Sequence, residues 1–583
     1  LDFVVGTSTM GRTYSFAANF MPILRENTEF AVKWANLSDA QINEGIRDPI
    51  VAYEYMNRYY VVEGNKRVSV LKYFKADSIV ANVTRKIPKY SEDEDVKIYY
   101  EYMKFNEITG LFNIEFSKPG MAEQLLELTG CTTRWDPEVR SEFNSLLLHF
   151  TRAYEFRGGS KLPITVGDAL TAFINVYGYK ESLAMSDAEM NTNVVKCWNE
   201  FVMLTEKQSV GLVMDPQAAE ERKGRSIFSY FMPSSAKKFT VAFLYPKSPD
   251  TSDWIYAHDL GRNYLEETFP DQMKTICVND VTEERTEQVL NDVIRQGADI
   301  IFEVAPQMMK PSLKIAVDHP DVKILNCTLN TSHKYIRTYY ARMYEAKFIA
   351  GVIAGALADN NKIAYIADYP IYGMIANINA FALGASFTNP RAQIYLEWST
   401  KKDYDREHFL TENDISVVSD QDMITPSDTK RQFGLYRIEE GRTLNLAMPL
   451  WNWGIFYEKM IQSILAGSYQ TEGNSEDRAL NYWWGMSAGV IDMICSNNVP
   501  AGVRRLADHL KHDIKKGDMV PFYGEIYSQD GELRNKSNVA MKPEAIMEMD
   551  WLVANVKGSI PTMDTLIDAA QTVVQLKGVE ETK

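Results

Sequence analysis

Aromatic side chains alternate with carboxylate and amide groups in several segments of the second half of the chain, each placed after a predicted strand. Asp253 and Trp254 follow a strand predicted at residues 239–245, and Asp420 follows one predicted at 415–419. Aromatic faces can stack on a planar heterocycle, while carboxylate and amide atoms bind its polar edge. We therefore predict a ligand-binding site that contains eight residues, namely Asp253, Trp254, Met308, Asp420, Asn452, Trp453, Tyr482 and Trp483.

Each of these tryptophans has a second interpretation, as a core residue or as an anchor at a lobe surface. For any single tryptophan, that interpretation is as good as a role in binding. The recurrence of rings beside polar groups in separate segments, such as 451–453 and 481–484, favours a shared site. The guest that these residues predict is a planar heterocycle, since stacking of one base on a ring contributes roughly 1–3 kcal/mol.

The elements that must position these residues alternate between strands and helices from about Lys238 onward. Strands are predicted at 239–245, 298–304, 322–326 and 362–367, with helices such as 258–268 and 344–357 between them. This alternation predicts an α/β fold with parallel sheets and helices on both faces. The region is too long for one sheet, so we predict two doubly wound lobes. Ligands of such sheets bind at the carboxyl ends of the strands.

The same region resembles the basic membrane protein family of periplasmic-type purine- or nucleoside-binding proteins. The matching segments run in order through residues 238–556 and include 252–262, 297–302, 339–351, 378–385, 452–454, 481–483 and 521–524. The resemblance implies a two-lobed periplasmic-binding-protein-like fold that closes on its ligand. It also implies that Trp254 stacks on the base, that Asp253 and Asn452 contact its edge or a sugar, and that Trp453, Tyr482 and Trp483 wall the cleft.

Two positions depart from the pattern of this family. Gly434 to Ile438 stand where nucleoside binders usually place an aspartate for the ribose hydroxyls, and Ser487 stands where a lysine is common. Both departures concern ribose recognition. They leave a free purine base, or a different ligand, as alternatives to a nucleoside.

A second set of residues near the N-terminus could bind a phosphate. Gly64, Asn65, Lys66 and Arg67 lie between a predicted strand and a predicted helix, where free N–H groups and two cations would face an anion. The alternative interpretation is a strand–helix corner with two solvated basic residues, and the motif alone favours it.

The surrounding residues, from Asn36 to Pro88, resemble the ParB N-terminal and sulfiredoxin-like fold, an α+β domain. That resemblance implies nucleoside triphosphate binding and, in some members, phosphorylation of small molecules. Glu63 is then a candidate general base, although a carboxylate beside two cations is as often a structural salt bridge. The second nucleotide-contacting box of the ParB proteins is missing, which argues against a DNA clamp.

The composition limits the classes of function. The chain has 583 residues and a net charge of −16, and such a surface repels nucleic acid, so DNA is not an expected partner. Five scattered cysteines without CxxC spacing argue against disulfides and zinc and are typical of a reducing compartment. No metal, cofactor or catalytic constellation is expected, and no stretch is apolar enough for a membrane span. No signal peptide opens the chain. Because the sequence begins with Leu1 rather than Met, this absence is only weak evidence against export.

These observations predict five regions along the chain. They are a ParB-like domain at 1–118, a helical connector at 119–213, a linker at 214–237, the ligand-binding domain at 238–561 and a helical tail at 562–583. Asp136 and Pro137 are predicted to begin one helix of the connector, and Ser186 with Glu189 to begin another.

Three functional hypotheses result. The first is a cytoplasmic sensor that closes on a purine-type ligand and passes the closure to the N-terminal domain. The second is an extracytoplasmic, membrane-anchored substrate-binding lipoprotein that works with an ABC transporter permease. The third is a nucleotide-dependent enzyme acting through Glu63 to Arg67. For the ligand-binding domain itself we expect no enzymatic activity.

Overall fold

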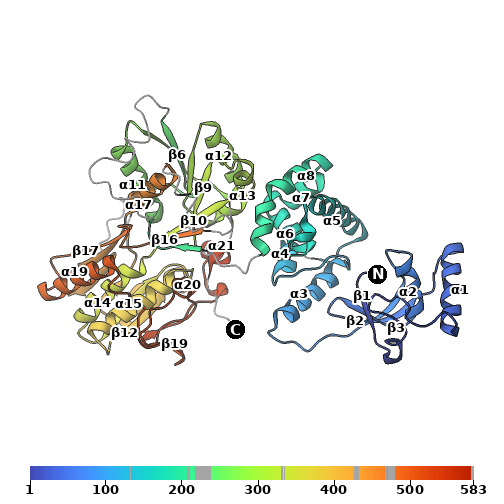
Figure 1. The fold of residues 1–583 in the computed structure, drawn as a ribbon. Coiled ribbons are helices and arrows are strands. Elements are labelled where there is room, and N and C mark those ends of the chain that lie inside the picture. Colours follow the sequence, from blue (N-terminus) through green and yellow to red (C-terminus); the bar gives the residue numbers. More distant parts are fainter. Residues whose placement is uncertain are drawn as a thin grey trace. The chain divides into compact units, whose positions relative to one another are not determined.

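A computed structural model describes residues 1–130, 133–205, 211–216, 238–329, 333, 335–423, 425, 432–465, 469 and 480–578. The chain forms two compact units, Leu1–Asn191 and Thr192–Lys583 (Figure 1). Most of the linker predicted at 214–237 lies outside the described residues, as does Cys131. None of the described helices combines the length and the apolar run that a membrane span needs.

The N-terminal unit opens with a four-stranded sheet in the order β1-β3-β2-β4. Strands β2 and β3 form a hairpin, in which Met56 and Asn57 both have positive φ, as a two-residue turn between antiparallel strands requires. Buried Glu54 ties this sheet to a helix, because it accepts hydrogen bonds from Arg85 Nε at 2.6 Å and from the Tyr99 hydroxyl at 3.0 Å. The elements are β1 (Val4–Thr7), α1 (Glu29–Asn43), β2 (Ile50–Tyr55), β3 (Arg58–Glu63), α2 (Asn65–Tyr73), β4 (Ala81–Arg85) and α3 (Glu94–Thr109).

Helices make up the rest of this unit. The predicted start of α5 (Pro137–Arg157) is confirmed, since the Asp136 side chain accepts from Glu138 N and Val139 N at 2.9 Å. Ser186 and Glu189 form the predicted capping box at the start of α8 (Asp187–Lys196). The other elements of this unit are α4 (Met121–Thr129), α6 (Val166–Tyr177) and α7 (Tyr179–Ala184). The boundary between the two units falls within α8, so α9 (Trp198–Thr205) belongs to the C-terminal unit.

The C-terminal unit contains two seven-stranded sheets, and we call the half built on the first of them lobe A. Its sheet has the order β5-β16-β10-β9-β8-β6-β7, and every strand pair is parallel, as predicted. Helices α11 (Asp253–Thr268) and α17 (Trp453–Leu465) pack together, as do α12 (Glu283–Arg295) and α13 (Met309–Asp318). The strands are β5 (Gly211–Val213), β6 (Phe239–Leu244), β7 (Met273–Val278), β8 (Ile300–Glu303), β9 (Lys323–Cys327), β10 (Ile336–Ala341) and β16 (Leu480–Trp484).

Lobe B is built on the second sheet, in the order β17-β15-β14-β13-β11-β12-β20. The prediction of a wholly parallel sheet is wrong here, because β13, β14, β15 and β17 pair antiparallel. A tight turn at Glu440 and Gly441, both with positive φ, joins β14 directly to β15 and so reverses the chain without a crossover helix. The strands are β11 (Lys362–Ala367), β12 (Gln393–Trp398), β13 (Val417–Ser419), β14 (Leu435–Glu439), β15 (Arg442–Trp451), β17 (Ile491–Cys495) and β20 (Val556–Lys557).

The helices of lobe B are α14 (Tyr344–Leu357), α15 (Met374–Thr388), α16 (Arg406–Glu412) and α19 (Ala501–Lys516). Helices α14 and α15 approach closely because glycines face the partner backbone: a Cβ on Gly351 would lie 2.0 Å from the Phe381 carbonyl oxygen. Any side chain at this position would force the two helices apart.

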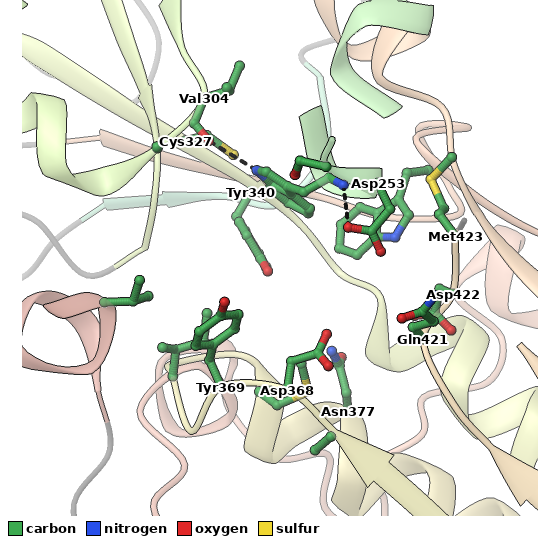
Figure 2. A pocket seen from close by; sticks show the side chains of 18 of the residues that line it. Asp253, Val304, Cys327, Tyr340, Asp368, Tyr369, Asn377, Gln421, Asp422 and Met423 are labelled. Atoms are coloured by element: carbon green, nitrogen blue, oxygen red, sulfur yellow. Dashed lines mark hydrogen bonds between the residues drawn. The ribbon is translucent and has the colours of Figure 1, made fainter. Parts of the chain in front are cut away.

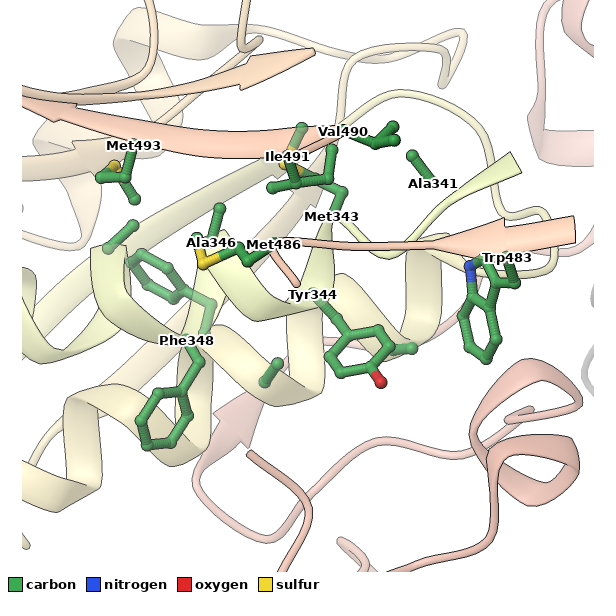
Figure 3. Close-up of a cluster of buried hydrophobic side chains, with 14 of the residues drawn as sticks. Ala341, Met343, Tyr344, Ala346, Phe348, Trp483, Met486, Val490, Ile491 and Met493 are labelled. Carbon is green, nitrogen blue, oxygen red and sulfur yellow. The ribbon is translucent and has the colours of Figure 1, made fainter. Parts of the chain in front are cut away.

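The chain crosses between the lobes three times, from β10 to α14, from β15 to α17 and from β16 to β17. The hydrophobic core continues through these crossings, where Met343, Tyr344, Met486 and Ile491 are buried together (Figure 3). Short crossings of this kind can act as a hinge about which two lobes rotate. The last segment of the chain adds the hairpin β18 (Ile526–Tyr527) and β19 (Leu533–Asn535), then α20 (Pro543–Met547) and α21 (Asp568–Lys577).

Candidate functional site

A pocket of about 360 Å³ lies between lobe A and lobe B. On the side of lobe A it is lined by segments that directly follow β6, β8 and β9, and on the side of lobe B by segments that follow β11 and β13. Figure 2 shows Asp253 on one side of the cavity and Asp368, Tyr369 and Asn377 on the opposite side. The carboxyl ends of the strands therefore form the site, as predicted for a doubly wound sheet.

Trp254 occupies the first turn of α11 and lines the pocket. The helix begins there because the Ser252 side chain accepts from Ile255 N, as an N-cap does. The indole Nε1 donates to the carbonyl oxygen of Val304 at 3.0 Å, which fixes the plane of the ring. The ring lies 5.9 Å from that of Tyr340 in a stacked arrangement and meets Trp451 edge-on at 5.3 Å. The three rings pack on one another and form one continuous aromatic surface against which a planar guest can stack.

Two carboxylates line the pocket from opposite lobes. Asp253 of lobe A accepts a hydrogen bond from Trp254 N at 2.8 Å, and Asp368 of lobe B accepts one from the Ser399 hydroxyl at 2.8 Å. Burial raises the pKa of Asp368 to about 6, and the negative charge of Asp253 adds to that shift. Burial also raises the pKa of Asp253. A ligand that donates an N–H or O–H hydrogen bond to either carboxylate would therefore stabilise its ionised form.

The other two aspartates of the pocket are engaged by neighbouring groups. Asp422 forms an ion pair with Lys347, a buried lysine on α14, and its Oδ1 lies 2.5 Å from the lysine Nζ. Burial raises the pKa of Asp422, whereas Lys347 acts in the opposite direction. Asp420 accepts from the Tyr436 hydroxyl at 3.1 Å and from Arg406 Nε at 3.3 Å. These two carboxylates are held in place before any ligand arrives.

Three of the eight predicted ligand-binding residues line the pocket: Asp253, Trp254 and Asp420. The structure does not bring the other five to it. Met308 is fully buried behind the pocket wall, where its neighbour Gln307 is the lining residue. Asn452 begins α17 with its backbone, and its side-chain amide donates to the Gly489 carbonyl oxygen at 3.0 Å, so it secures a turn instead.

The remaining three residues lie in the core. Trp453 is 1% exposed and stacks on His258 at 4.3 Å, which joins α17 to α11. Tyr482 and Trp483 were predicted in a loop, but they belong to β16, inside the lobe A sheet between β5 and β10. Both side chains are almost completely buried there, in the core and away from the pocket.

Sequence reasoning placed several lining residues after strands without assigning them to the site, among them Asp368, Tyr369, Asp422 and Trp451. Their positions at strand ends were the signal. Asn377, on the first turn of α15, and Val573, on α21, gave no such signal, because they reach the pocket through the packing of helices.

The two departures from the family pattern also have structural roles. Gly434 has a φ of 61°, and a Cβ there would lie 2.6 Å from the Ala447 carbonyl oxygen, so the β14–β15 pairing requires glycine. Ser487 accepts from Arg342 Nη2 at 3.0 Å and donates to Asp215. Neither residue lines the pocket.

The predicted phosphate-binding residues of the N-terminal unit surround the start of α2. Gly64 has a φ of 100°, and a Cβ there would lie 2.5 Å from Ile50 Cγ2, which explains the glycine. Asn65 is buried, and its Oδ1 has no hydrogen-bond partner among the described residues. Lys66 lies over the Phe30 ring at 4.6 Å, and Arg67 Nη1 donates to the carbonyl oxygen of Asp48 at 3.0 Å.

The position of Arg67 favours the structural interpretation of this corner. Its guanidinium also lies 3.8 Å from Glu63, so the candidate base and its neighbouring cation form an ion pair. Burial and the nearby cations Lys33 and Arg12 lower the pKa of Lys66. Phosphate binding here stays a prediction, as does the resemblance to the ParB N-terminal fold. No group of His, Cys, Asp or Glu residues suited to a metal ion occurs in the described part of the chain.

The second half of the chain is similar in sequence to known substrate-binding proteins. Residues 238–431 match the Bmp family model, described as ABC transporter substrate-binding protein PnrA-like. A purine-binding protein of Brucella abortus is 26% identical over 339 residues, which cover 56% of this chain and 95% of that protein. A Haloferax volcanii protein, provisionally assigned as an ABC transporter glucose-binding protein, is 26% identical over 271 residues, or 44% of this chain and 67% of its own.

Among solved structures, an ABC transporter solute-binding protein from Conexibacter woesei aligns with 48% of this chain and 98% of its own, at 13% identity and a TM-score of 0.37. The lobed α/β architecture described above and the family match agree with the resemblance noted in the sequence. Residues 238–431 therefore belong to a substrate-binding domain of the Bmp, PnrA-like type.

Proposed function

We propose that the C-terminal unit binds an unphosphorylated purine base or nucleoside between its lobes. The observation that carries this proposal is the pairing of aromatic surface, from Trp254, Tyr340 and Trp451, with carboxylates that face the pocket from both lobes. A purine offers two faces for stacking and N–H groups on its edges for carboxylate acceptors. The purine-binding relative from Brucella abortus supports the same ligand class.

The two carboxylates also provide a reason for the lobes to close on a ligand. Asp253 and Asp368 raise the free energy of the ligand-free closed state, because two buried negative charges from opposite lobes repel. A ligand that donates hydrogen bonds to both removes this cost in the closed state only. Such a difference in affinity between the open and closed states is what a ligand-driven conformational change requires.

Phosphorylated ligands fit this pocket poorly. Its lining contains Asp253, Asp368, Asp420 and Asp422 but only two lysines, Lys247 and Lys347. Since Lys347 already pairs with Asp422, the field at the pocket is negative and disfavours a phosphate. Glucose also presents hydroxyl donors and an apolar face, and it is the second candidate because of the relative from Haloferax volcanii.

A thermal-shift panel with the full chain tests the ligand class. Adenine, guanine, hypoxanthine and their nucleosides, the matching monophosphates, uracil and glucose are compared at equal concentration. We expect at least one purine to raise Tm and its monophosphate not to, because a ligand of the native state stabilises it by mass action. Stabilisation by glucose alone would replace the purine proposal with a sugar, and stabilisation by none of them would contradict both.

We further propose that closure is passed to the N-terminal unit, which makes the protein a cytoplasmic ligand sensor. The stretch of chain that leads from the N-terminal unit into lobe A contains β5, the edge strand of the lobe A sheet, which pairs with β16. Immediately after β5, Met214 and Asp215 contact Arg342: the guanidinium donates to the Met214 carbonyl oxygen and lies 3.5 Å from the Asp215 carboxylate.

Arg342 connects this stretch to two of the lobe crossings. It lies between β10 and α14 and donates to Trp483 O at 3.0 Å and to Glu345 at 2.7 Å. Glu345 in turn accepts from Met486 N at 2.6 Å, in the crossing from β16 to β17. A rotation at these crossings would therefore act on the stretch that leads to the N-terminal unit.

The alternative is a substrate-binding component of an ABC importer outside the cytoplasm, and the Bmp family match favours it. Hydrogen exchange with and without the stabilising ligand separates the two functions. A sensor would show ligand-dependent exchange in β1 to β4, and Asp215→Ala would reduce that response. An importer component would show changes confined to residues 238–578. Cell fractionation of the native protein supplies an independent measurement.

The matched family is described as substrate-binding, and we propose binding without catalysis for the C-terminal unit. A nucleotide-dependent reaction in the N-terminal unit remains the third hypothesis, supported by the buried Asn65 and the left-handed Gly64 at the start of α2. Incubation of the full chain with labelled nucleoside triphosphate tests it, with Lys66→Ala as the matched variant. Absence of turnover in the parent protein would remove the hypothesis.

A further inference from the structure

The C-terminal helix α21 is anchored on lobe B by backbone contacts at both ends. Before the helix, Ile567 N donates to the Thr400 carbonyl oxygen at 2.9 Å, and Leu566 forms an isolated β-bridge with Lys401. After the helix, Gly578 forms a second bridge with Ile371. Because both ends are fixed on the same lobe, α21 has a defined position relative to the strand ends of lobe B.

One face of α21 is buried against lobe B. Ala570 and Val574, together with Leu566, form a separate apolar cluster that packs on Tyr369 and Ile371. Both of these partners follow β11 and line the pocket. The helix therefore packs directly behind a pocket wall.

A second face of α21 meets lobe A and the pocket. The helix contacts the single turn of 3-10 helix at Pro306–Met308, which follows β8 in lobe A. Val573 lines the pocket itself, while its neighbour Thr572 is exposed and Val574 is buried. Successive residues of a helix point about 100° apart, so one turn of α21 presents these three side chains to solvent, pocket and lobe B in order.

We propose that α21 is a wall of the ligand site and that Val573 determines how large a ligand the pocket accepts on this side. The helix reaches from Tyr369 and Ile371 on lobe B to the 3-10 turn at Pro306–Met308 on lobe A, and so it borders this side of the pocket. The identity of the ligand rests on the function proposed above, whereas the role of α21 as a wall does not.

The first experiment changes the size of residue 573. Val573→Trp fills the pocket from this wall, and Thr572→Trp places the same ring on the exposed neighbour as a control. We expect Val573→Trp to lower affinity for the stabilising ligand about tenfold, since overpacking a defined cavity is costly, and the control to leave affinity unchanged. Equal affinities for both variants and the parent chain would overturn the proposal.

The second experiment needs no ligand and so separates failure of this proposal from failure of the proposed function. Cys327 lines the pocket and is 3% exposed, which makes its alkylation a measure of access. Val574→Asp places a charge in the apolar cluster that holds α21, and Thr572→Asp places the same charge on the exposed face. Both are made with Cys277→Ser, because Cys277 is exposed.

Iodoacetamide labelling of Cys327, followed by mass spectrometry of the peptide, is the readout. We expect Val574→Asp to raise the labelling rate at least several-fold over Thr572→Asp while the circular dichroism spectrum and the low reactivity of buried Cys197 stay unchanged. Equal labelling rates at Cys327 would show that α21 does not close the pocket. If purines fail to bind but this difference is found, α21 is a wall of a site for another ligand.

Discussion

Two groups of aromatic residues in the C-terminal unit are both rich in tryptophan but have different surroundings. Trp254, Tyr340 and Trp451 line the pocket, while Trp483 and Trp484 lie in β16 with almost no exposure. Trp254 has its indole N–H satisfied by the Val304 carbonyl oxygen. The Nε1 atoms of Trp483 and Trp484 find no hydrogen-bond partner among the described residues.

The difference teaches that the place of a strand in the fold matters more than residue type. Tyr340 and Trp483 are paired in register, one residue before the ends of β10 and β16, yet Tyr340 lines the pocket and Trp483 packs in the core against Tyr344. The same contrast holds for two buried carboxylates. Asp368 follows β11 and faces the pocket, while Glu303 ends β8 and is held by Ser312 and Asn326.

The largest effect on stability is expected from the strand group, that is, Trp483 and Trp484 of β16. Trp483→Ala should lower the free energy of unfolding by about 3–5 kcal/mol, because it leaves a cavity where the ring meets Tyr344. Denaturant unfolding of the variant and the parent measures the difference. Trp254→Ala is the matched control, and a smaller loss of stability from Trp483→Ala than from the control would break the comparison.

Substitutions in the pocket group, that is, Trp254, Tyr340 and Trp451, should change the affinity for the ligand. Trp254→Ala is expected to weaken purine affinity by about 1–3 kcal/mol, since a stacking surface is lost, with a smaller change in Tm than Trp483→Ala. Isothermal titration calorimetry measures the affinity. If Trp254→Ala binds like the parent chain, stacking on this ring is not part of recognition, and the wall formed by Tyr340 and Trp451 becomes the candidate.

Asp368 should give opposite changes in affinity and in stability. Asp368→Asn removes a charged acceptor and is expected to weaken binding about tenfold. The ligand-free variant should be more stable than the parent at pH 7.5, by on the order of 1 kcal/mol, because a buried carboxylate with a raised pKa is costly when ionised. Asp403→Asn, at an exposed position, is the control for both measurements.

The pH dependence of binding follows from the same carboxylate. The pKa of Asp368 lies at about 6 in the folded protein, above its ordinary value. The acceptor is therefore ionised at pH 7.5 and becomes protonated as the pH falls through 6, so affinity should fall between pH 7 and pH 5. A flat affinity profile in the parent, or an unchanged profile in Asp368→Asn, would show that this carboxylate does not bind the ligand.

Glu303 should affect stability alone, and its effect should be the smallest. Burial raises its pKa to about 7, so the folded state holds a proton that the unfolded state releases near pH 4 to 5. Stability is therefore lost as the pH rises from 5 through 7. Glu303→Gln should flatten this slope and leave purine affinity within about twofold. A large loss of affinity would place Glu303 with the pocket group.

The strands and helices were largely predictable from the sequence, because their signals are local. Alternation of apolar runs and turn residues located β6, β8, β9 and β11 to within a few residues. Asp136 and Ser186 marked helix starts, since an N-cap depends only on the next few residues. The antiparallel half of the lobe B sheet was missed, because strand direction depends on which strands pair.

The site was predictable only where it follows a strand directly. Asp253, Trp254 and Asp420 follow strands and line the pocket, whereas Trp453 and Trp483, predicted from the same kind of composition, are buried in the core.

By itself, then, the sequence determined most elements of the C-terminal unit, the resemblance of residues 238–431 to the Bmp family and the residues that end its strands. The tertiary structure alone decided which rings face the pocket, that Asp253 and Asp368 approach it from opposite lobes, and that Val573 completes it. The physical reason is distance along the chain: these residues meet through the pairing of strands and the packing of helices that no local pattern records.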